Sequence, residues 1–301
     1  MLDLIIIGAG PAGITASVYA ARKKMELLVI TEDNGGQAAW SGDIENYTGY
    51  QFITGPDLAA KFEEHMRIFD IQLKDNEEVI ELKKIADKVR VKTDTGVYEA
   101  KAAIIASGKR SRELNVPGEK EFKNRGLTYC ATCDGPLFAG KDVAVIGGGN
   151  SALDAALQLI KIARHIHIIN IAERLTGDPV MQDKLRQAKN VTVLNNTQVT
   201  AVLGNKFVSG IRIRKDAKEE IIPVEGVFVE IGLIPNSEFA KDPDKNQSGE
   251  IKVNSRNETN IPGIFAAGDV TDVSEKQIII AAGEGSKATL SVFRYLMQHQ
   301  F

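Results

Sequence analysis

The sequence predicts an α/β fold of two similar domains, the second inserted in the first, and three observations support this prediction. A short apolar run, a glycine-rich turn and an alanine-rich helical stretch open the chain at residues 4–22. The same pattern returns at residues 143–163. Further buried-strand patterns occur at residues 98–107, 228–232 and 263–269, as expected of parallel sheets. A chain of 301 residues also exceeds one ordinary core, so its length predicts two domains.

The first repeat carries the spacing of a dinucleotide-binding turn. Residues 4–7 read as a buried parallel strand, and Gly8 to Gly13 (GAGPAG) complete the pattern G-x-G-x-x-G. A helix and a second strand follow, and Glu32 stands where an acid meets the ribose of a dinucleotide. The glycines allow a tight turn and let the backbone approach a pyrophosphate at the helix amino terminus. This repeat therefore predicts a Rossmann-like domain that binds a dinucleotide.

The second repeat differs from the first at one informative position. The strand at 143–146 leads into Gly147 to Ala152 (GGGNSA), which reads G-x-G-x-x-A, and a helix and a strand at 165–169 follow. These elements predict a second Rossmann-like domain. Asn170, and not an acid, follows its second strand.

The linkers predict the limits of the two domains. Residues 112–117 are expected to lead out of the first domain, and the charged residues 241–245 are expected to lead back. The outer domain would then comprise residues 1–113 and 246–301, and the inserted domain residues 114–245. A long apolar pattern at 278–297 predicts a final helix in the outer domain.

The composition excludes several classes of protein. It is 43% apolar and 26% charged, with a formal net charge of −3, which argues against a nucleic-acid partner. No apolar run approaches the length of a membrane span. Asp3 stands where a signal peptide would be basic, so we expect no secretion signal. We therefore expect a cytoplasmic protein, in a compartment where thiols are kept reduced.

Both cysteines of the chain, Cys130 and Cys133, lie in the stretch YCATCDGP. A cytosolic CxxC is more often redox-active or metal-binding than structural. A structural zinc site takes about four ligands, and four scattered histidines do not supply them, so we expect no metal site. Redox chemistry is favoured, with a pair of inert, reduced cysteines as the alternative. In redox chemistry, Asp134 would deliver a proton to a departing thiolate.

The motifs together resemble those of the low-molecular-weight thioredoxin reductases. GAGPAG, GGQ at 35–37, ENY at 45–47, CATCD, GGGNSA and AAGD at 266–269 occur in that family's order over nearly the whole chain. DGPLFAGK, VMQDKLRQAKNV and KQIIIAAGEGSKA are similar, in places more closely, to the carboxy-terminal flavoprotein part of alkyl hydroperoxide reductase. Because GAGPAG starts at residue 8, we expect no thioredoxin-like extension before it, which favours the thioredoxin reductase interpretation.

The resemblance implies FAD in the outer domain, NADH or NADPH in the inserted one, and a homodimer that reduces thioredoxin or a thioredoxin-like protein. It implies that Cys130 and Cys133 form the redox disulfide, with Asp134 as the acid–base group. Rotation of the inserted domain would bring the disulfide and the nicotinamide in turn to the flavin. The implied FAD contacts are Gly8, Gly10, Pro11, Gly13, Glu32, Gly36, Gln37, Asn46, Gly268, Asp269 and Gln277. The implied nicotinamide nucleotide contacts are Gly147, Gly149, Asn150, Ser151, Ala152, Asn170 and Gly232.

The electron donor is where this chain departs from the family. NADPH-using members carry a His-Arg-Arg stretch after the second strand of the inserted domain, whereas residues 169–174 here read INIAER. Asn170 replaces both the acid expected for NADH and the basic cluster expected for NADPH. We therefore expect NADH to be used at least as well as NADPH. Two alternatives stay open: the same chemistry with a ferredoxin-like donor or a peroxiredoxin-system partner, and a non-catalytic flavin redox sensor.

Overall fold

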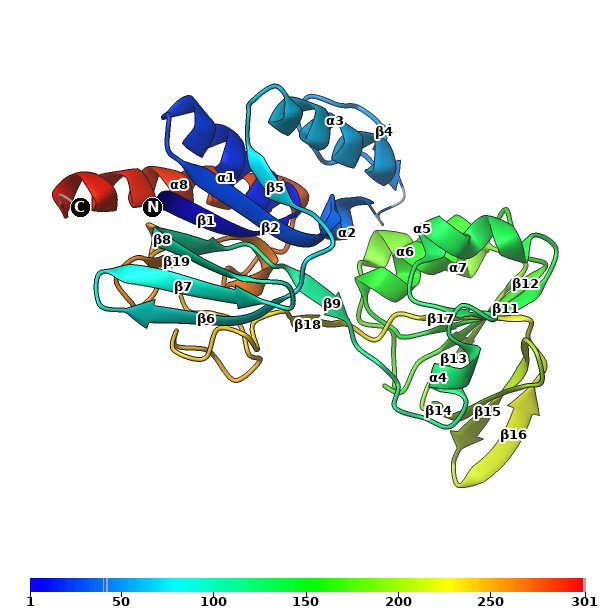
Figure 1. The fold of residues 1–301 in the computed structure, drawn as a ribbon. Helices are drawn as coiled ribbons and strands as arrows, with labels where there is room; N and C mark the ends of the chain where they lie inside the picture. The colour runs from blue at the N-terminus through cyan, green and yellow to red at the C-terminus, as the bar shows by residue number, and fades with distance from the viewer. Residues whose placement is uncertain (40, 42, 300–301) are drawn as a thin grey trace. The chain divides into compact units, whose positions relative to one another are not determined.

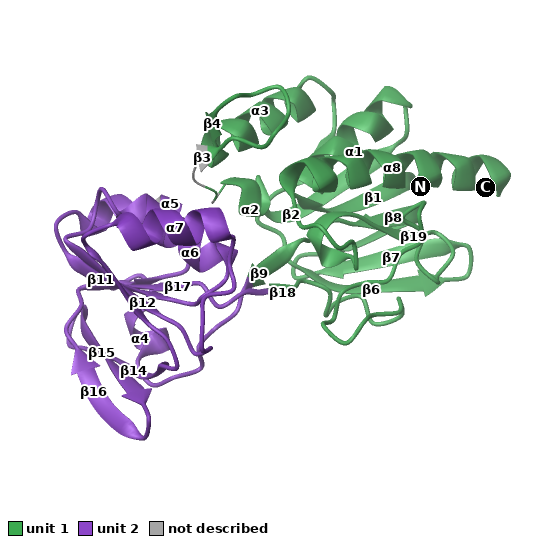
Figure 2. Ribbon diagram, turned by 180° about the vertical axis from the view of Figure 1, so that it is seen from behind, with its two compact units in different colours: residues 1–110, 234–301 green, residues 111–233 purple. Residues whose placement is uncertain are grey.

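The structure, a computed structural model, describes residues 1–39, 41 and 43–299, with the side chains of Asp43 and Cys133 outside the description. It divides into two compact units (Figure 1 and Figure 2). Unit 1 comprises residues 1–110 and 234–301, and unit 2 comprises residues 111–233. The α/β prediction is confirmed: each unit contains a parallel sheet of the Rossmann-like kind, and unit 2 is inserted in unit 1.

The sheet of unit 1 is built around its first strand. β1 (Leu2–Ala9) runs parallel to β2 (Leu27–Asn34) on one side and to β8 (Val97–Ile105) on the other. β5 (Gln72–Lys74) extends the sheet beyond β2, and β19 (Ile264–Ala266) pairs with β8, both in parallel. The carboxyl ends of these strands therefore meet at one edge of the sheet, where Rossmann-like folds bind ligands.

Successive residues of β1 enter different cores, which explains its continuous apolar run. Ile6 packs with residues of two helices, whereas Ile7 packs with residues of an antiparallel hairpin on the other face. The helices on the first face are α1 (Pro11–Arg22) and α8 (Ile278–Gln298). The hairpin consists of β6 (Val79–Ile85) and β7 (Lys88–Thr93), which continue the sheet antiparallel beyond β8 and pack their side chains on the second face. The smaller elements of unit 1 are α2 (Gly36–Ala39), β3 (Asp43–Ile44), β4 (Ile53–Thr54), α3 (Gly55–Arg67) and the short 3₁₀ turn η2 (Gly268–Val270).

Unit 2 repeats the plan with a shorter sheet, in the strand order β10-β17-β11-β12-β13 with parallel pairing throughout. Its strands are β10 (Leu127–Thr128), β11 (Asp142–Ile146), β12 (His165–Ile169), β13 (Val191–Leu194) and β17 (Gly226–Val229). Its helical elements are α4 (Glu119–Phe122), α5 (Ala131–Asp134), η1 (Gly135–Phe138), α6 (Asn150–Leu159) and α7 (Pro179–Gln187). An antiparallel sheet of β14 (Gln198–Gly204), β15 (Val208–Lys215) and β16 (Lys218–Ile222) completes the unit.

The limits of the units differ from those expected from the sequence, which placed them after residues 113 and 245. The chain leaves unit 1 after Arg110 and returns at Ile234, through the paired strands β9 (Lys109–Ser111) and β18 (Leu233–Pro235). The charged residues 241–245 belong to unit 1, because the segment before them is already anchored there: Ala240 is buried in its core and Phe239 O accepts the Leu82 amide at 3.0 Å. A run of charges therefore marked a surface loop and not the linker.

The turn between β1 and α1 is shaped by contacts that exclude side chains. Gly8 has φ +104°, and a Cβ there would lie 2.4 Å from the Ala106 carbonyl oxygen. A Cβ on Gly13 would lie 1.8 Å from the Gly8 oxygen, so α1 packs directly on the strand end. These two glycines are therefore fixed by packing alone, whatever the turn binds.

Gly13→Ala should destabilise the protein strongly, because backbone must move to admit the methyl group. We expect a loss of about 3 kcal/mol or more in the free energy of unfolding, measured by urea denaturation. The matched control is Gly283→Ala in α8, where a Cβ would meet no atom within 4 Å. That change should be neutral or stabilise by up to ~1 kcal/mol. Equal effects of the two substitutions would contradict the packing explanation.

Candidate functional site

Each fingerprint turn leaves its middle glycine facing open space. Gly10 is the N-cap of α1, and a Cβ there would have its nearest neighbour, the Gly36 Cα, at 4.0 Å. Gly149 is the N-cap of α6, and its nearest neighbour would be the Thr176 hydroxyl oxygen at 3.9 Å. The backbone at both positions is thus free to approach a pyrophosphate at a helix amino terminus. The residues present fit a dinucleotide in each unit.

The structure brings two further predicted FAD residues, Gly36 and Gly268, to the first fingerprint. Gly36, with φ +53°, lies against Gly10, and Gly268 lies against Ala12 of α1, since a Cβ on Gly268 would be 3.0 Å from the Ala12 Cβ. Asn46 Nδ2 donates to Gln277 Oε1 at 3.1 Å, which joins two predicted contacts that are far apart in the chain. The assignment of these residues to FAD stays a prediction that this clustering supports.

The predicted acids of this site both have raised pKa values. Burial raises the pKa of Asp269, against the opposing charges of Lys276 and Lys109. Burial also raises the pKa of Glu32, which lies at the end of β2, and the carboxylates of Glu78, Asp33 and Asp94 add to the shift. The Gln37 amide donates to the Lys109 carbonyl at 3.2 Å, so its side chain is anchored within unit 1.

A charged cluster beside Asp269 has no signal in the sequence. Glu250 Oε1 accepts from Lys109 Nζ at 2.8 Å and from Lys276 Nζ at 3.0 Å, and the three side chains are largely buried. Burial alone would raise the pKa of Glu250, but hydrogen bonds from Lys109, Asn246 and Lys276 outweigh it and hold the pKa at about 2. In this corner of unit 1, the two lysines therefore face two carboxylates, Glu250 and the neighbouring Asp269.

In unit 2 the second fingerprint turn is held by two other segments. Gly147 has φ +140°, and a Cβ there would lie 2.1 Å from the Glu230 carbonyl oxygen. Asn150 begins α6 and its Oδ1 accepts the Asp178 amide at 2.7 Å. Ser151 is exposed, Ala152 is fully buried, and Gly232, with φ +101°, faces open space. Asn150 and Ser151 therefore lie at the turn, Ala152 packs below it in the core, and the role of Gly232 stays a prediction.

Asn170 is used inside the protein. It is 4% exposed, and its amide nitrogen donates to the Ala172 carbonyl at 3.2 Å and to Asn195 Oδ1 at 2.8 Å. Its oxygen accepts the Ala172 amide at 3.2 Å, and a Cβ on Gly148 would lie 2.4 Å from that oxygen. Both amide hydrogens are therefore taken. A contact with a ribose hydroxyl stays a prediction, limited to the remaining lone pair of the oxygen.

The redox motif lies in unit 2, close to the second fingerprint. Cys130 directly precedes α5, is half-buried and takes part in a disulfide bond. Its amide donates to the Thr128 hydroxyl at 3.1 Å, and its carbonyl accepts the Asp134 amide at 3.2 Å. The chain's other cysteine is Cys133, whose side chain lies outside the described residues. The half-buried Asp134 ends α5, one residue after it.

A polar chain connects this motif to α6. Thr132 lies between the cysteines, and its hydroxyl donates to Gln158 Oε1 at 2.9 Å. Gln158 Nε2 in turn donates to Asp154 Oδ2 at 2.8 Å. Burial, together with the charge of Asp154, raises the pKa of Glu230 to about 8. Sequence reasoning missed Glu230, because only the fold places this residue beside the fingerprint.

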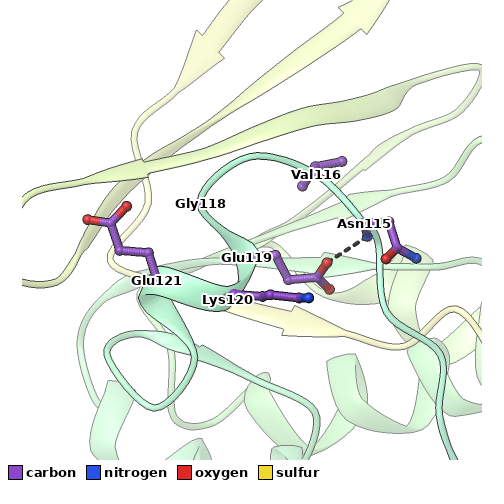
Figure 3. A pocket seen from close by; sticks show the side chains of 6 residues that line it. All are labelled: Asn115, Val116, Gly118, Glu119, Lys120 and Glu121. Atoms are coloured by element: carbon purple, nitrogen blue, oxygen red, sulfur yellow. Dashed lines mark hydrogen bonds between the residues drawn. The ribbon is translucent and has the colours of Figure 1, made fainter.

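The start of unit 2 is clamped by a buried carboxylate, which Figure 3 shows in a small pocket. Glu119 accepts the amides of Leu114 and Asn115, both at 2.6 Å, and the Tyr129 hydroxyl at 2.7 Å. Burial, followed by this hydrogen bond, raises the pKa of Tyr129. The pocket is lined by Asn115, Val116, Gly118, Glu119, Lys120 and Glu121. It contains none of the predicted site residues, and we assign the clamp a structural role.

Neither a metal cluster nor a membrane-spanning helix is found among the described residues. Within residues 1–39, 41 and 43–299, no group of three or more His, Cys, Asp or Glu side chains is placed to hold a metal ion. Over the same part of the chain, no helix is long and apolar enough to cross a membrane. The expected lack of a metal stays a prediction.

Glu230→Gln should make stability less dependent on pH. The pKa of Glu230 rises from 4.5 to about 8 on folding, so the native state holds an extra proton between these values and loses stability as pH increases. The amide side chain of the Glu230→Gln variant does not titrate, so the variant does not lose this stability as pH increases. We expect the variant to match the wild type near the lower value and to exceed it at the higher value by roughly 2–4 kcal/mol. Urea unfolding across this range tests it, and parallel pH profiles would contradict it.

The chain is similar to known proteins over its whole length. A family model described as pyridine nucleotide-disulphide oxidoreductase matches residues 2–285. A protein named NADH dehydrogenase from Bacillus subtilis is 42% identical over 301 residues, which cover 99% of this chain and 59% of the relative. The F subunit of alkyl hydroperoxide reductase from Staphylococcus aureus is 40% identical, with the same shares covered. The chain thus spans 59% of the length of these curated relatives.

A solved structure matches over its full length. Thioredoxin reductase from Lactococcus lactis is 32% identical, superposes with a TM-score of 0.93, and is covered to 100%, with 99% of this chain. Members of this group use FAD and a nicotinamide nucleotide, which the two open fingerprint turns accommodate. The chain therefore belongs to the pyridine nucleotide-disulphide oxidoreductase family and is an oxidoreductase that uses FAD and NAD(P)H.

Proposed function

We propose that this protein is a disulfide reductase that passes electrons from a nicotinamide nucleotide, through FAD and the Cys130–Cys133 pair, to thioredoxin or a similar small redox protein. The observation that carries the proposal is Cys130 in a disulfide at the start of α5, in the unit that also contains the second fingerprint. The similarity to a thioredoxin reductase over the whole chain supports it.

The roles of the residues follow from thiol chemistry. A bound FAD would supply the two-electron transfer that connects the nicotinamide to the protein disulfide. One thiolate of the reduced pair then attacks the partner's disulfide and forms a mixed disulfide; the second thiol breaks it, which leaves the partner as a dithiol and the pair oxidised. Asp134 stands one residue after Cys133, where its carboxyl would give a proton to the departing thiolate.

The setting of the reductase is also a proposal. We place it in the cytoplasm, where cellular thiols are kept reduced, and we propose a homodimer on the family resemblance. Unit 2 carries both the CxxC and the second fingerprint, so a rotation that exchanged them at the flavin would be absorbed by the paired strands β9 and β18. The relatives named for alkyl hydroperoxide reduction favour a second candidate, in which the partner belongs to a peroxide-reducing system.

Cys130→Ser and Cys133→Ser should each abolish NADH-dependent reduction of a thioredoxin disulfide while FAD stays bound. A single thiol cannot both form and resolve the mixed disulfide. The measurement is turnover with thioredoxin, and separately with a peroxidase disulfide to distinguish the two candidate partners. Reduction of ferricyanide, which needs only the flavin, serves as the control and should be retained. Wild-type disulfide turnover in either variant would refute the dithiol mechanism and favour a sensor.

NADH should support turnover at least as well as NADPH. After β12, Asn170 is buried, Ile171 is 72% exposed, and Glu173 stands beside Arg174, the nearest cation in this stretch. A hydrogen bond to a charged group contributes about 1.5–3 kcal/mol. Lacking one or two such bonds to the 2′-phosphate would weaken NADPH by roughly 10- to 1,000-fold, at about 1.4 kcal/mol per decade.

The measurement is kcat/KM for both nucleotides at one salt concentration. Glu173→Arg should improve NADPH selectively, by about tenfold, because it removes a repelling charge and adds an attracting one. Glu225→Arg, an exposed acid elsewhere in unit 2, is the matched control and should change neither value. A wild-type preference for NADPH above about tenfold would contradict the prediction. Failure of both nucleotides to reduce the flavin would favour a different donor.

A further inference from the structure

Glu230 is placed at the second fingerprint by the sheet itself. Ile146 pairs with Val229 in the ladder between β11 and β17, and the Glu230 amide continues it by donating to the Ile146 carbonyl at 2.8 Å. Gly147, the next residue of the fingerprint, therefore lies opposite Glu230. The contact is close, since a Cβ on Gly147 would be 2.1 Å from the Glu230 oxygen.

The alternation of β17 determines which face Glu230 shares. Phe228 packs in the core that contains the buried residues of α6, whereas Val227 and Val229 pack on the opposite face with residues of β14 and β15. Because alternate side chains of a strand share a face, Glu230 lies on the α6 side of the sheet. Its carboxyl is thus directed toward the layer formed by the fingerprint helix.

The charged group of that layer that acts on Glu230 is an acid, although α7, which also packs against α6, carries Asp183, Lys184 and Arg186. Asp154 on α6 is the group, among the described residues, whose charge acts on Glu230. α5 packs against α6 and carries Asp134. The polar chain from Asp154 through Gln158 to Thr132 adds amide and hydroxyl groups, none of which supplies a positive charge.

We propose that Glu230 is a proton-binding residue of the nicotinamide nucleotide site, which admits the nucleotide beside Gly147 when its carboxyl is neutral and repels the phosphates when it is ionised. The proposal depends on unit 2 taking the nucleotide and is independent of which disulfide protein is reduced. In this proposal, nucleotide binding requires a neutral carboxyl at Glu230, in addition to the fingerprint turn.

Burial favours the neutral form of the Glu230 carboxyl near neutral pH. Burial and the like charge of Asp154 raise the pKa of Glu230 to about 8, so the carboxyl is protonated near neutrality. The pyrophosphate of a bound dinucleotide adds negative charge and raises this pKa further. Binding then takes up a proton above the pKa of the free protein, and the dissociation constant increases by about tenfold for each pH unit.

The test is calorimetric titration of the oxidised, FAD-loaded protein with NAD⁺, which does not reduce the flavin. The dissociation constant is measured from about pH 6.5 to about pH 9.5, in two buffers with different ionisation enthalpies, so that protons taken up on binding are counted directly. For the wild type we expect weakening of about tenfold per unit at the upper end and uptake of up to ~1 proton. Glu230→Gln, which mimics the neutral carboxyl, should bind with a constant affinity and no proton uptake.

Two further variants distinguish the effect of Glu230 from the effects of other acidic residues. Asp154→Asn removes the like charge and should move the wild-type transition to lower pH without abolishing it. Glu225→Gln changes an exposed acid at the other end of β17 and should behave as the wild type. A wild-type affinity independent of pH would overturn the proposal, as would a Glu230→Gln variant that keeps the full pH dependence, or an absence of NAD⁺ binding at every pH. Turnover with a protein disulfide is not involved, so the proposed function can fail or stand separately.

Discussion

Both units depend on one contact, in which the turn after the first strand passes against the end of a neighbouring strand without room for a side chain. Gly8 meets the Ala106 carbonyl in unit 1, and Gly147 meets the Glu230 carbonyl in unit 2. These approaches set the position of each helix amino terminus and leave the middle glycines open. The two fingerprints differ in their last residue: a Cβ on Gly13 would overlap the Gly8 oxygen, whereas the Ala152 side chain is accommodated in the core of unit 2.

The same fold surrounds two different electrostatic environments. Beside the first turn, Lys109 and Lys276 share Glu250 and also act on the neighbouring Asp269, so cations and carboxylates are paired there. Beside the second turn, Glu230 and Asp154 form an acidic pair. Lysines can attract an anionic ligand, whereas an acidic pair repels it less only while one of the two carboxyls holds a proton. Fold similarity therefore leaves the binding properties of each unit to a few side chains outside the fingerprints.

The sequence could predict what depends on local pattern. The strand–turn–helix repeats and the inserted arrangement are confirmed by the structure, whereas the assignment of Gly36 and Gly268 to FAD stays a prediction. It could not predict Glu250 or Glu230, because the groups that shift their pKa values are distant in the chain or have no motif. The return from unit 2 was placed too late, at 245, since residues 234–240 carry no pattern that distinguishes packing on unit 1 from a linker.

Asn170 shows why donor choice is the property least readable from spacing. Its spacing from the fingerprint is that of a ribose-binding acid, and an amide can form a hydrogen bond with a ribose hydroxyl. In the structure that amide closes the turn between Ala172 and Asn195 and fills the space above Gly148. An acid there would lack the two donors that these carbonyl oxygens need. Asn170 therefore holds the turn, and our proposal for donor choice depends on the side chains that follow it, of which Glu173 and Arg174 carry the charge.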